Sequence, residues 1–148
     1  MHLSNALPII LASLPALIGA ESFADRCDQY RILPYSDEHG WILQATCPGD
    51  GYTGYSALPL DWCLINNDGT IVAQENGGLS STCRDGCTIS TGIPEVGCIC
   101  DPNPDGFTQS HLDLMINIAP TVTNNDGVLE CFGQKGWTTT QSSATTAV

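Results

Sequence analysis

Asn66-Asn67-Asp68-Gly69, followed by Thr70-Ile71-Val72-Ala73, is the stretch that decides how this chain folds. The same order returns at 124–131, where Asn-Asn-Asp-Gly precedes Val-Leu-Glu-Cys. Asp-Gly favours the positive φ angles of tight two-residue turns, and the apolar residues after it favour a strand. Each stretch therefore predicts a β-hairpin, and the recurrence predicts two copies of one unit.

Other features of the chain also occur twice, at nearly constant offsets. Cys27 and Cys83 are 56 residues apart, and Cys47 and Cys100 are 53 apart. A unit of about 50 residues buries little core alone, so we expect the two copies to share one core and to exchange elements. The expected boundaries are about 22–78 for repeat one, about 79–133 for repeat two and 21–133 for the whole domain.

Composition limits the possible partners. The 148 residues carry 16 Asp and Glu against 4 Lys and Arg, a formal net charge of −12. Binding to nucleic acid or to an anionic membrane needs clustered cationic side chains, which four basic residues cannot supply. The length corresponds to one small domain or two fused half-size units.

The two ends of the chain differ from its middle. Residues 1–20 are apolar, lack Asp, Glu, Lys and Arg, and end in Gly-Ala, which predicts a cleaved secretory signal peptide. No second apolar run follows, so we expect a secreted, extracellular protein without membrane insertion. Residues 134–148 are rich in Thr, Ser, Ala and Gln, which predicts a disordered tail.

Short apolar alternations broken by Gly, Pro, Asn and Asp predict an all-β fold. In residues 41–47, the alternation places Leu43, Ala45 and Cys47 on one face of a strand. Short helical turns are expected at 60–65 and 114–119.

All eight cysteines lie between Cys27 and Cys131, downstream of the expected cleavage point. An even number of cysteines in a small exported chain predicts disulfides. Structural zinc is the alternative, but the spacings Cys98-x-Cys100 and Cys83-x3-Cys87 lack the paired CxxC pattern of zinc sites. Eight cysteines alone allow 105 pairings.

Three pieces of the chain resemble the cyanovirin-N homology (CVNH) family of lectins over residues 22–133. They are the opening 22–27, the strand Leu-Gln-Ala-Thr-Cys at 43–47, and the block Ser-Ala-Leu-Pro-Leu-Asp-Trp-Cys-Leu-Ile-Asn-Asn-Asp-Gly at 56–69. The resemblance implies two tandem pseudo-symmetric repeats, each a three-stranded sheet plus a β-hairpin. It also implies that the repeats are intertwined, so that each half of the molecule contains elements of both repeats.

The resemblance further implies two bridges that clamp hairpins, Cys27–Cys47 and Cys83–Cys100. Three pairings of the other four cysteines then remain open. We favour the pairing in which Cys87–Cys98 lies inside the second hairpin and Cys63–Cys131 joins the two repeats in the half built from the first sheet.

Asn amides and Asp carboxylates on rigid turns suit sugar hydroxyls, which both donate and accept hydrogen bonds. The alternative is that the two turns serve only the hairpins. The resemblance implies that each glycan site combines the turn of one repeat with the segments flanking the disulfide of the other. One site would use Asn124, Asn125, Asp126, Asp25, Arg26 and Asp50. The second, which we favour, would use Asn66, Asn67, Asp68, Ser81, Thr82, Asp101 and Asn103.

A competing pattern is Asp101-x-Asn103-x-Asp105-Gly106, which matches the first half of an EF-hand calcium loop. The twelfth position is Leu112 instead of Glu, and two prolines stiffen the loop, so we expect no metal here. No nucleophile motif such as Gly-x-Ser-x-Gly is present. We therefore expect no enzymatic activity and no cofactor.

The sequence as a whole favours a secreted lectin whose partners are oligosaccharides or glycoproteins, with mannose-type glycans among the candidates. The chain would be a monomer or a dimer in which two copies exchange elements. The alternative is a secreted, disulfide-rich structural or protein-interaction module with degenerate sugar sites.

Overall fold

The computed structural model describes residues 22–49, 52–90, 92–101 and 113–139. The expected signal peptide, the candidate residues Asp50 and Asn103, and residues 140–148 lie outside these ranges. Within them, every helix is short, and none is long and apolar enough to span a membrane. Most of the described chain is β-strand, which confirms the predicted fold class.

The first half of the molecule is built on an antiparallel sheet from repeat one. A short helix, α1 (Phe23–Arg26), precedes strands β1 (Asp28–Ser36), β2 (Gly40–Gly49) and β3 (Tyr52–Pro59). The hairpin packed against this sheet comes from repeat two and consists of β9 (Thr123–Asn125) and β10 (Val128–Cys131). α1 is tied to this hairpin, because the backbone N–H of Phe23 donates to the Val122 carbonyl at 3.2 Å.

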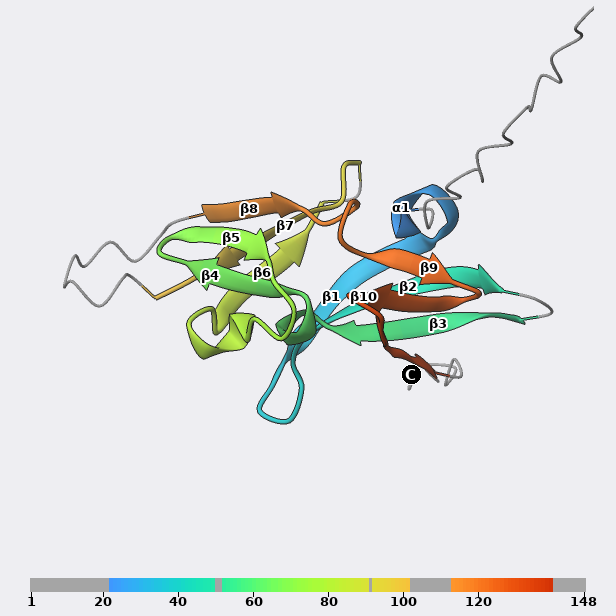
Figure 1. The fold of residues 1–148 in the computed structure, drawn as a ribbon, viewed down its shortest axis with the longest axis horizontal. Helices are drawn as coiled ribbons and strands as arrows, with labels where there is room; N and C mark the ends of the chain where they lie inside the picture. The colour runs from blue at the N-terminus through green and yellow to red at the C-terminus, as the bar shows by residue number, and fades with distance from the viewer. Residues whose placement is uncertain (1–21, 50–51, 91, 102–112, 140–148) are drawn as a thin grey trace, which may run out of the picture.

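The second half repeats the arrangement with the roles exchanged. Its sheet, in the order β6–β7–β8, comes from repeat two and consists of β6 (Asp85–Ile89), β7 (Glu95–Ile99) and β8 (Asp113–Asn117). Its hairpin comes from repeat one and consists of β4 (Leu64–Asn67) and β5 (Thr70–Ala73), with β5 packed against β8. Two 3-10 turns, η1 (Leu60–Trp62) and η2 (Leu79–Ser81), precede β4 and β6. Figure 1 shows the two halves side by side, which confirms the intertwined architecture.

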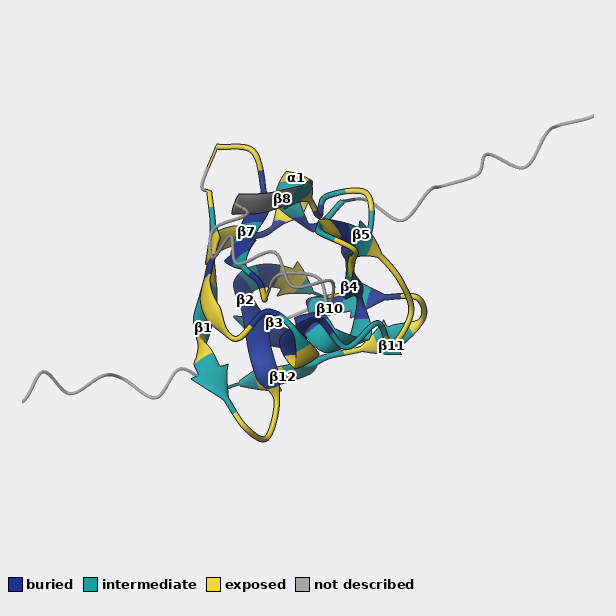
Figure 2. Cartoon of the chain, turned by 90° about the vertical axis from the view of Figure 1, so that its left-hand side faces the viewer, coloured by how far each residue is buried: buried dark blue, intermediate teal, exposed yellow. Residues whose placement is uncertain are grey.

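Both repeats contribute to one continuous core. Leu43, Ala45 and Cys47 of β2 are fully buried, as the alternation predicts. The other face of β2 is also covered, because Gln44 is buried and its side-chain oxygen accepts a hydrogen bond from Arg31 Nε at 2.9 Å. Leu79 of repeat two belongs to the same buried cluster. Figure 2 shows the buried parts of β2 and β3 in the middle of the molecule, with exposed loops around them.

The four disulfides follow the implied and favoured pairings. Their sequence separations are 20, 17, 11 and 68 residues for Cys27–Cys47, Cys83–Cys100, Cys87–Cys98 and Cys63–Cys131. The last bridge joins the end of η1 to β10 and thus links the repeats covalently. No cysteine is left as a free thiol, so the zinc alternative has no thiolate ligand.

Two sequence-based expectations about secondary structure need correction. The helical turn expected at 60–65 is limited to η1, after which β4 begins at Leu64. The helical turn expected at 114–119 is wrong, because β8 continues as a strand through Asn117. Its backbone pairs with β7 from Glu95 to Ile99, and this pairing between distant segments overrides the local pattern.

The start of the expected tail is also different. Residues 134–139 form β11 (Gln134–Lys135) and β12 (Trp137–Thr139). β12 pairs with β3, and the ring of Trp137 lies 6.4 Å from that of Trp62. Trp137 therefore anchors this segment to the first sheet, which composition dominated by Thr and Ser does not indicate.

Candidate functional site

The two Asn-Asn-Asp-Gly turns have the same local structure. The φ angles are 49° and 92° at Asp68 and Gly69, and 50° and 90° at Asp126 and Gly127. Two successive positive φ angles define the tight hairpin turn that Asp-Gly favours. The first Asn of each turn, at positions 66 and 124, accepts a hydrogen bond from the glycine N–H through Oδ1, at 2.9 Å and 2.8 Å. Each turn is thus held rigid by its own side chain.

The turn of repeat one docks beside the Cys83–Cys100 disulfide of repeat two. Asn66 Nδ2 donates to Thr82 Oγ1 at 3.2 Å, and Thr82 directly precedes the bridged Cys83. The backbone N–H of Asp101, which follows Cys100, donates to the Thr82 carbonyl at 2.6 Å. The structure therefore brings together Asn66, Thr82 and Asp101, which the sequence analysis assigned to the second site.

The turn of repeat two docks in the corresponding place on repeat one. Asn124 Nδ2 donates to the Pro48 carbonyl at 3.1 Å, and Pro48 directly follows the bridged Cys47. A Cβ on Gly49 would lie 2.4 Å from the Asp126 carbonyl oxygen, so only glycine allows this close approach. α1, which contains the candidate residues Asp25 and Arg26, packs against β9.

The candidate side chains fall into a half-buried set and an exposed set. The docking residues Asn66, Asn124 and Thr82 are half-buried. The exposed members of the two sets are Asn67, Asp68, Ser81, Asp101, Asn125, Asp126, Asp25 and Arg26. Each turn thus presents one amide and one carboxylate to solvent on a fixed backbone.

The two candidate sites differ in how free their amides are. Asn125 Nδ2 donates to Glu130 Oε2 at 2.7 Å, which occupies part of its hydrogen-bonding capacity. Asn67 holds the matching position in the other turn, where Val72 stands in place of Glu130, three residues after the turn glycine. Among the described residues the side chain of Asn67 has no hydrogen-bond partner. The amide of the second site is therefore the one more available for a ligand.

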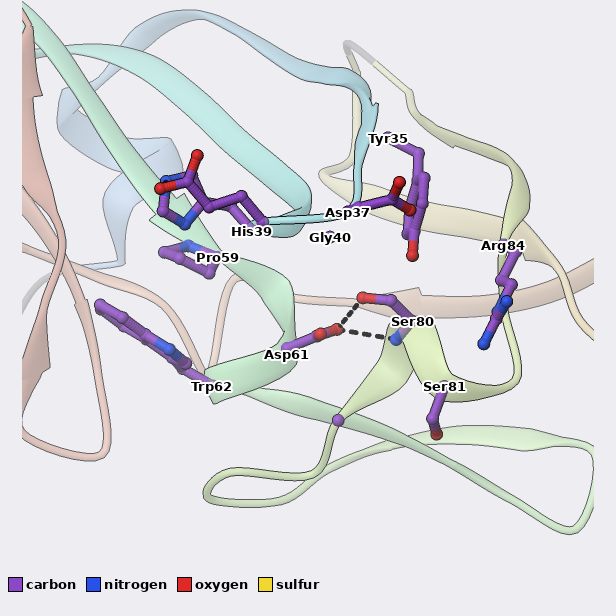
Figure 3. A pocket seen from close by; sticks show the side chains of 12 residues that line it. Tyr35, Asp37, His39, Gly40, Pro59, Asp61, Trp62, Ser80, Ser81 and Arg84 are labelled. Carbon is purple, nitrogen blue, oxygen red and sulfur yellow. Dashed lines mark hydrogen bonds and ion pairs between the residues drawn. The ribbon is translucent and has the colours of Figure 1, made fainter.

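A pocket that the sequence did not reveal lies at the junction of the two repeats (Figure 3). Its lining contains no residue of either turn but includes Ser81, a candidate residue of the second site. It has a volume of about 350 Å³ and is lined by the β1–β2 loop, the β3–η1 segment and the η2–β6 segment. No spacing rule joins these three segments, which are spread over positions 35 to 84.

Most of the loop with the partial calcium-binding pattern lies outside the described residues. Of its ligand positions, only Asp101 is described, while Asn103 and Asp105 are not. Across the described ranges there is no group of three or more His, Cys, Asp or Glu side chains placed to hold a metal ion.

Comparison with protein-family models gave a match over most of the expected domain. The model of the CVNH domain family matches residues 23–130, which is more than half of the chain. The chain belongs to the CVNH family. CVNH is a family of lectins, so membership implies a carbohydrate-binding protein.

Solved CVNH structures show the same fold. The CVNH protein of Gibberella zeae is 25% identical, with a TM-score of 0.52, covering 74% of this chain and 95% of that protein. The T. borchii and N. crassa CVNH proteins, 24% and 21% identical, superpose with TM-scores of 0.55 and 0.56. Their alignments cover 74% and 72% of this chain, and 98% and 94% of the other chains. Comparison with curated proteins gave no match.

Proposed function

We propose that this protein is a secreted lectin that binds oligosaccharides at two cross-repeat sites, each centred on an Asn-Asn-Asp-Gly turn. One observation supports the proposal most strongly. In both halves, the first Asn of the turn hydrogen-bonds to the residue next to a disulfide of the other repeat, at 3.2 Å and 3.1 Å. This docking leaves the next Asn and Asp exposed on a rigid backbone.

The exposed groups suit vicinal hydroxyls. A carboxylate such as that of Asp68 accepts two hydrogen bonds from neighbouring sugar hydroxyls, and an amide such as that of Asn67 both donates and accepts. Because the turn is already held by Asn66, binding costs little ordering of the protein. We infer that the site around Asp68 binds more tightly than the site around Asp126, where Glu130 engages the neighbouring amide.

Two sites favour multivalent binding. The hairpins β4–β5 and β9–β10 lie in opposite halves of the molecule (Figure 1). A branched glycan or a glycosylated surface that reaches both would bind with an affinity above that of either site, because the second contact is intramolecular. Mannose-type glycans, which carry several equivalent termini, are the first candidates.

Secretion is consistent with the covalent structure. The chain has four disulfides. Disulfides persist in oxidising compartments and are rare in proteins of reducing ones. Together with the expected signal peptide at 1–20, they support an extracellular protein whose partners are soluble or surface glycans.

A glycan array tests the proposal. The full secreted chain should bind at least one oligosaccharide class, and Asp68→Asn with Asp126→Asn in one chain should abolish that signal. Asp85→Asn, an exposed change of the same type on β6, should leave it unchanged. Silence of the unmodified protein across the array would contradict the proposal and favour a structural or protein-interaction module with degenerate sites.

A further inference from the structure

The pocket at the junction of the repeats is formed by contacts between the repeats. Asp61 Oδ1, in η1 of repeat one, accepts hydrogen bonds from the backbone N–H of Ser80 at 2.7 Å and from the Ser80 hydroxyl, in η2 of repeat two. Gly40 lies against the same serine, with a φ of +64°, and a Cβ there would lie 2.0 Å from Ser80 Oγ. The base of the pocket is therefore closed by backbone and side chains that cannot move independently.

The walls are also fixed. The Trp41 indole N–H donates to the Cys83 carbonyl at 2.6 Å in a buried contact, which ties the segment before Arg84 to β2. The ring of Tyr35 lies 5.6 Å from that of Trp41 and also lines the pocket. A preformed pocket of this size, near 350 Å³, falls within the range of about 300–1,000 Å³ typical of small-ligand sites.

Several polar groups that line this pocket are not used by the fold. Among the described residues, neither the Asp37 carboxylate nor the Arg84 guanidinium makes a hydrogen bond or an ion pair, and the hydroxyls of Tyr35 and Ser81 make no hydrogen bond. Figure 3 shows these four side chains around the space next to the Asp61–Ser80 pair. A pair of charged groups that line the same pocket without pairing is an arrangement suited to a ligand that bridges them.

The charged groups suit a ligand rich in hydroxyls. The pocket is lined by the Asp37 and Glu38 carboxylates and the Arg84 guanidinium, and a neutral polyol satisfies both kinds of group because its hydroxyls donate and accept. One hydroxyl of the ring donates to the Asp37 carboxylate, and another accepts from the Arg84 guanidinium, in charge-assisted hydrogen bonds. The hydroxyls of Tyr35 and Ser81 provide further donors and acceptors for the same ring.

We propose that this junction pocket is a third saccharide subsite, which holds one neutral pyranose unit between Asp37 and Arg84. The inference rests on the proposed lectin function; the pocket contains no residue of either turn and shares only Ser81 with the candidate residues of the second site. It predicts that a glycan contacts the molecule near the pseudo-symmetry junction as well as in the two halves.

An NMR titration of the uniformly ¹⁵N-labelled full chain tests this subsite. The probes are methyl α-D-mannopyranoside, methyl β-D-glucopyranoside and methyl β-D-galactopyranoside. The amides of Gly40 and Arg84 should shift saturably with at least one of them. The amides of Gly69 and Gly127 report separately on the two turns, so each site is followed in one experiment.

Variants assign the shifts to the pocket. Asp37→Asn and Arg84→Gln should each weaken the pocket response about tenfold or more while the turn amides respond as before, because each loses a charge-assisted contact. Asp85→Asn and Lys135→Gln are the charge-matched controls and should change neither response.

The outcomes separate the two proposals. Shifts at the turns without shifts at Gly40 and Arg84 would overturn the third subsite and leave the turn sites intact. Shifts at the pocket alone would support the subsite and contradict the proposed turn sites. A pocket response to L-alanine, a zwitterion, but to none of the three glycosides would overturn the assignment to a saccharide.

Discussion

Replacing Asn66 by alanine is expected to destabilise the protein as well as to weaken glycan binding. The change removes the bond of 2.9 Å to the Gly69 N–H and the bond of 3.2 Å to the Thr82 hydroxyl. Each hydrogen bond contributes about 0.5–1.5 kcal/mol net, so the free energy of unfolding should fall by about 1–3 kcal/mol. The second bond joins the repeats, so the loss should affect the whole domain and not only the hairpin.

Asp68→Asn is the matched control. Asp68 is exposed and has a φ of 49°, a conformation that Asn tolerates as well as Asp does. Its replacement should therefore change the free energy of unfolding by less than about 0.5 kcal/mol. Both variants should weaken binding of the oligosaccharide found on the array, but only Asn66→Ala should lower stability.

Guanidinium chloride unfolding with the disulfides intact measures both effects, with intrinsic tryptophan fluorescence as the signal. The denaturation midpoint should fall for Asn66→Ala with an unchanged slope, since the folded and unfolded surfaces stay the same. Equal midpoints for the two variants would refute the assignment of Asn66 to docking. A loss of stability for Asp68→Asn as large as that for Asn66→Ala would refute the separation of docking from binding.

Two further changes test the contacts between repeats. Gly40→Ala places a methyl group 2.0 Å from Ser80 Oγ at a φ of +64°, and strain plus overpacking should lower the free energy of unfolding by about 2–4 kcal/mol, measured by the same unfolding curve. Replacing Cys63 and Cys131 by serine opens a closed loop with a separation of 68 residues and should cost about 4 kcal/mol; removal of the bridge with a separation of 11 should cost about 3 kcal/mol. An unaltered midpoint for Gly40→Ala, or a greater cost for the shorter bridge, would contradict these assignments.

Much of the fold could be predicted because its determinants are local and repeated. Asn-Asn-Asp-Gly specifies a hairpin turn at both of its occurrences, and two copies of the unit imply a shared core. The resemblance to the CVNH family then supplied what no local signal contains, namely that each hairpin packs on the sheet of the other repeat. The two bridges it implied reduced the remaining cysteine pairings to three.

The errors occurred where distant segments decide the structure. Residues 114–119 form a strand because β7 provides a hydrogen-bonding partner, and 137–139 form a strand because β3 does. Neither partner is visible in the local composition. The sequence also could not separate Asn66 from Asn67, because only the position of Thr82 in space makes the first a docking residue, whereas no described residue hydrogen-bonds to the side chain of the second.

The junction pocket lay beyond sequence reasoning for the same reason. Asp37 and Arg84 are 47 positions apart and belong to no common motif. They line one pocket because Trp41 holds the Cys83 carbonyl and Asp61 holds Ser80. These are tertiary contacts, and only the folded chain shows them.

The crystal structure of the full chain with the oligosaccharide of highest affinity tests the central claim most directly. The account predicts sugar hydroxyls within hydrogen-bonding distance of the Asp68 side chain and, on the same ligand, of the segment next to Cys83 in the other repeat. A ligand bound on a surface formed by one repeat alone, with Asp68 and Asp126 untouched, would contradict it.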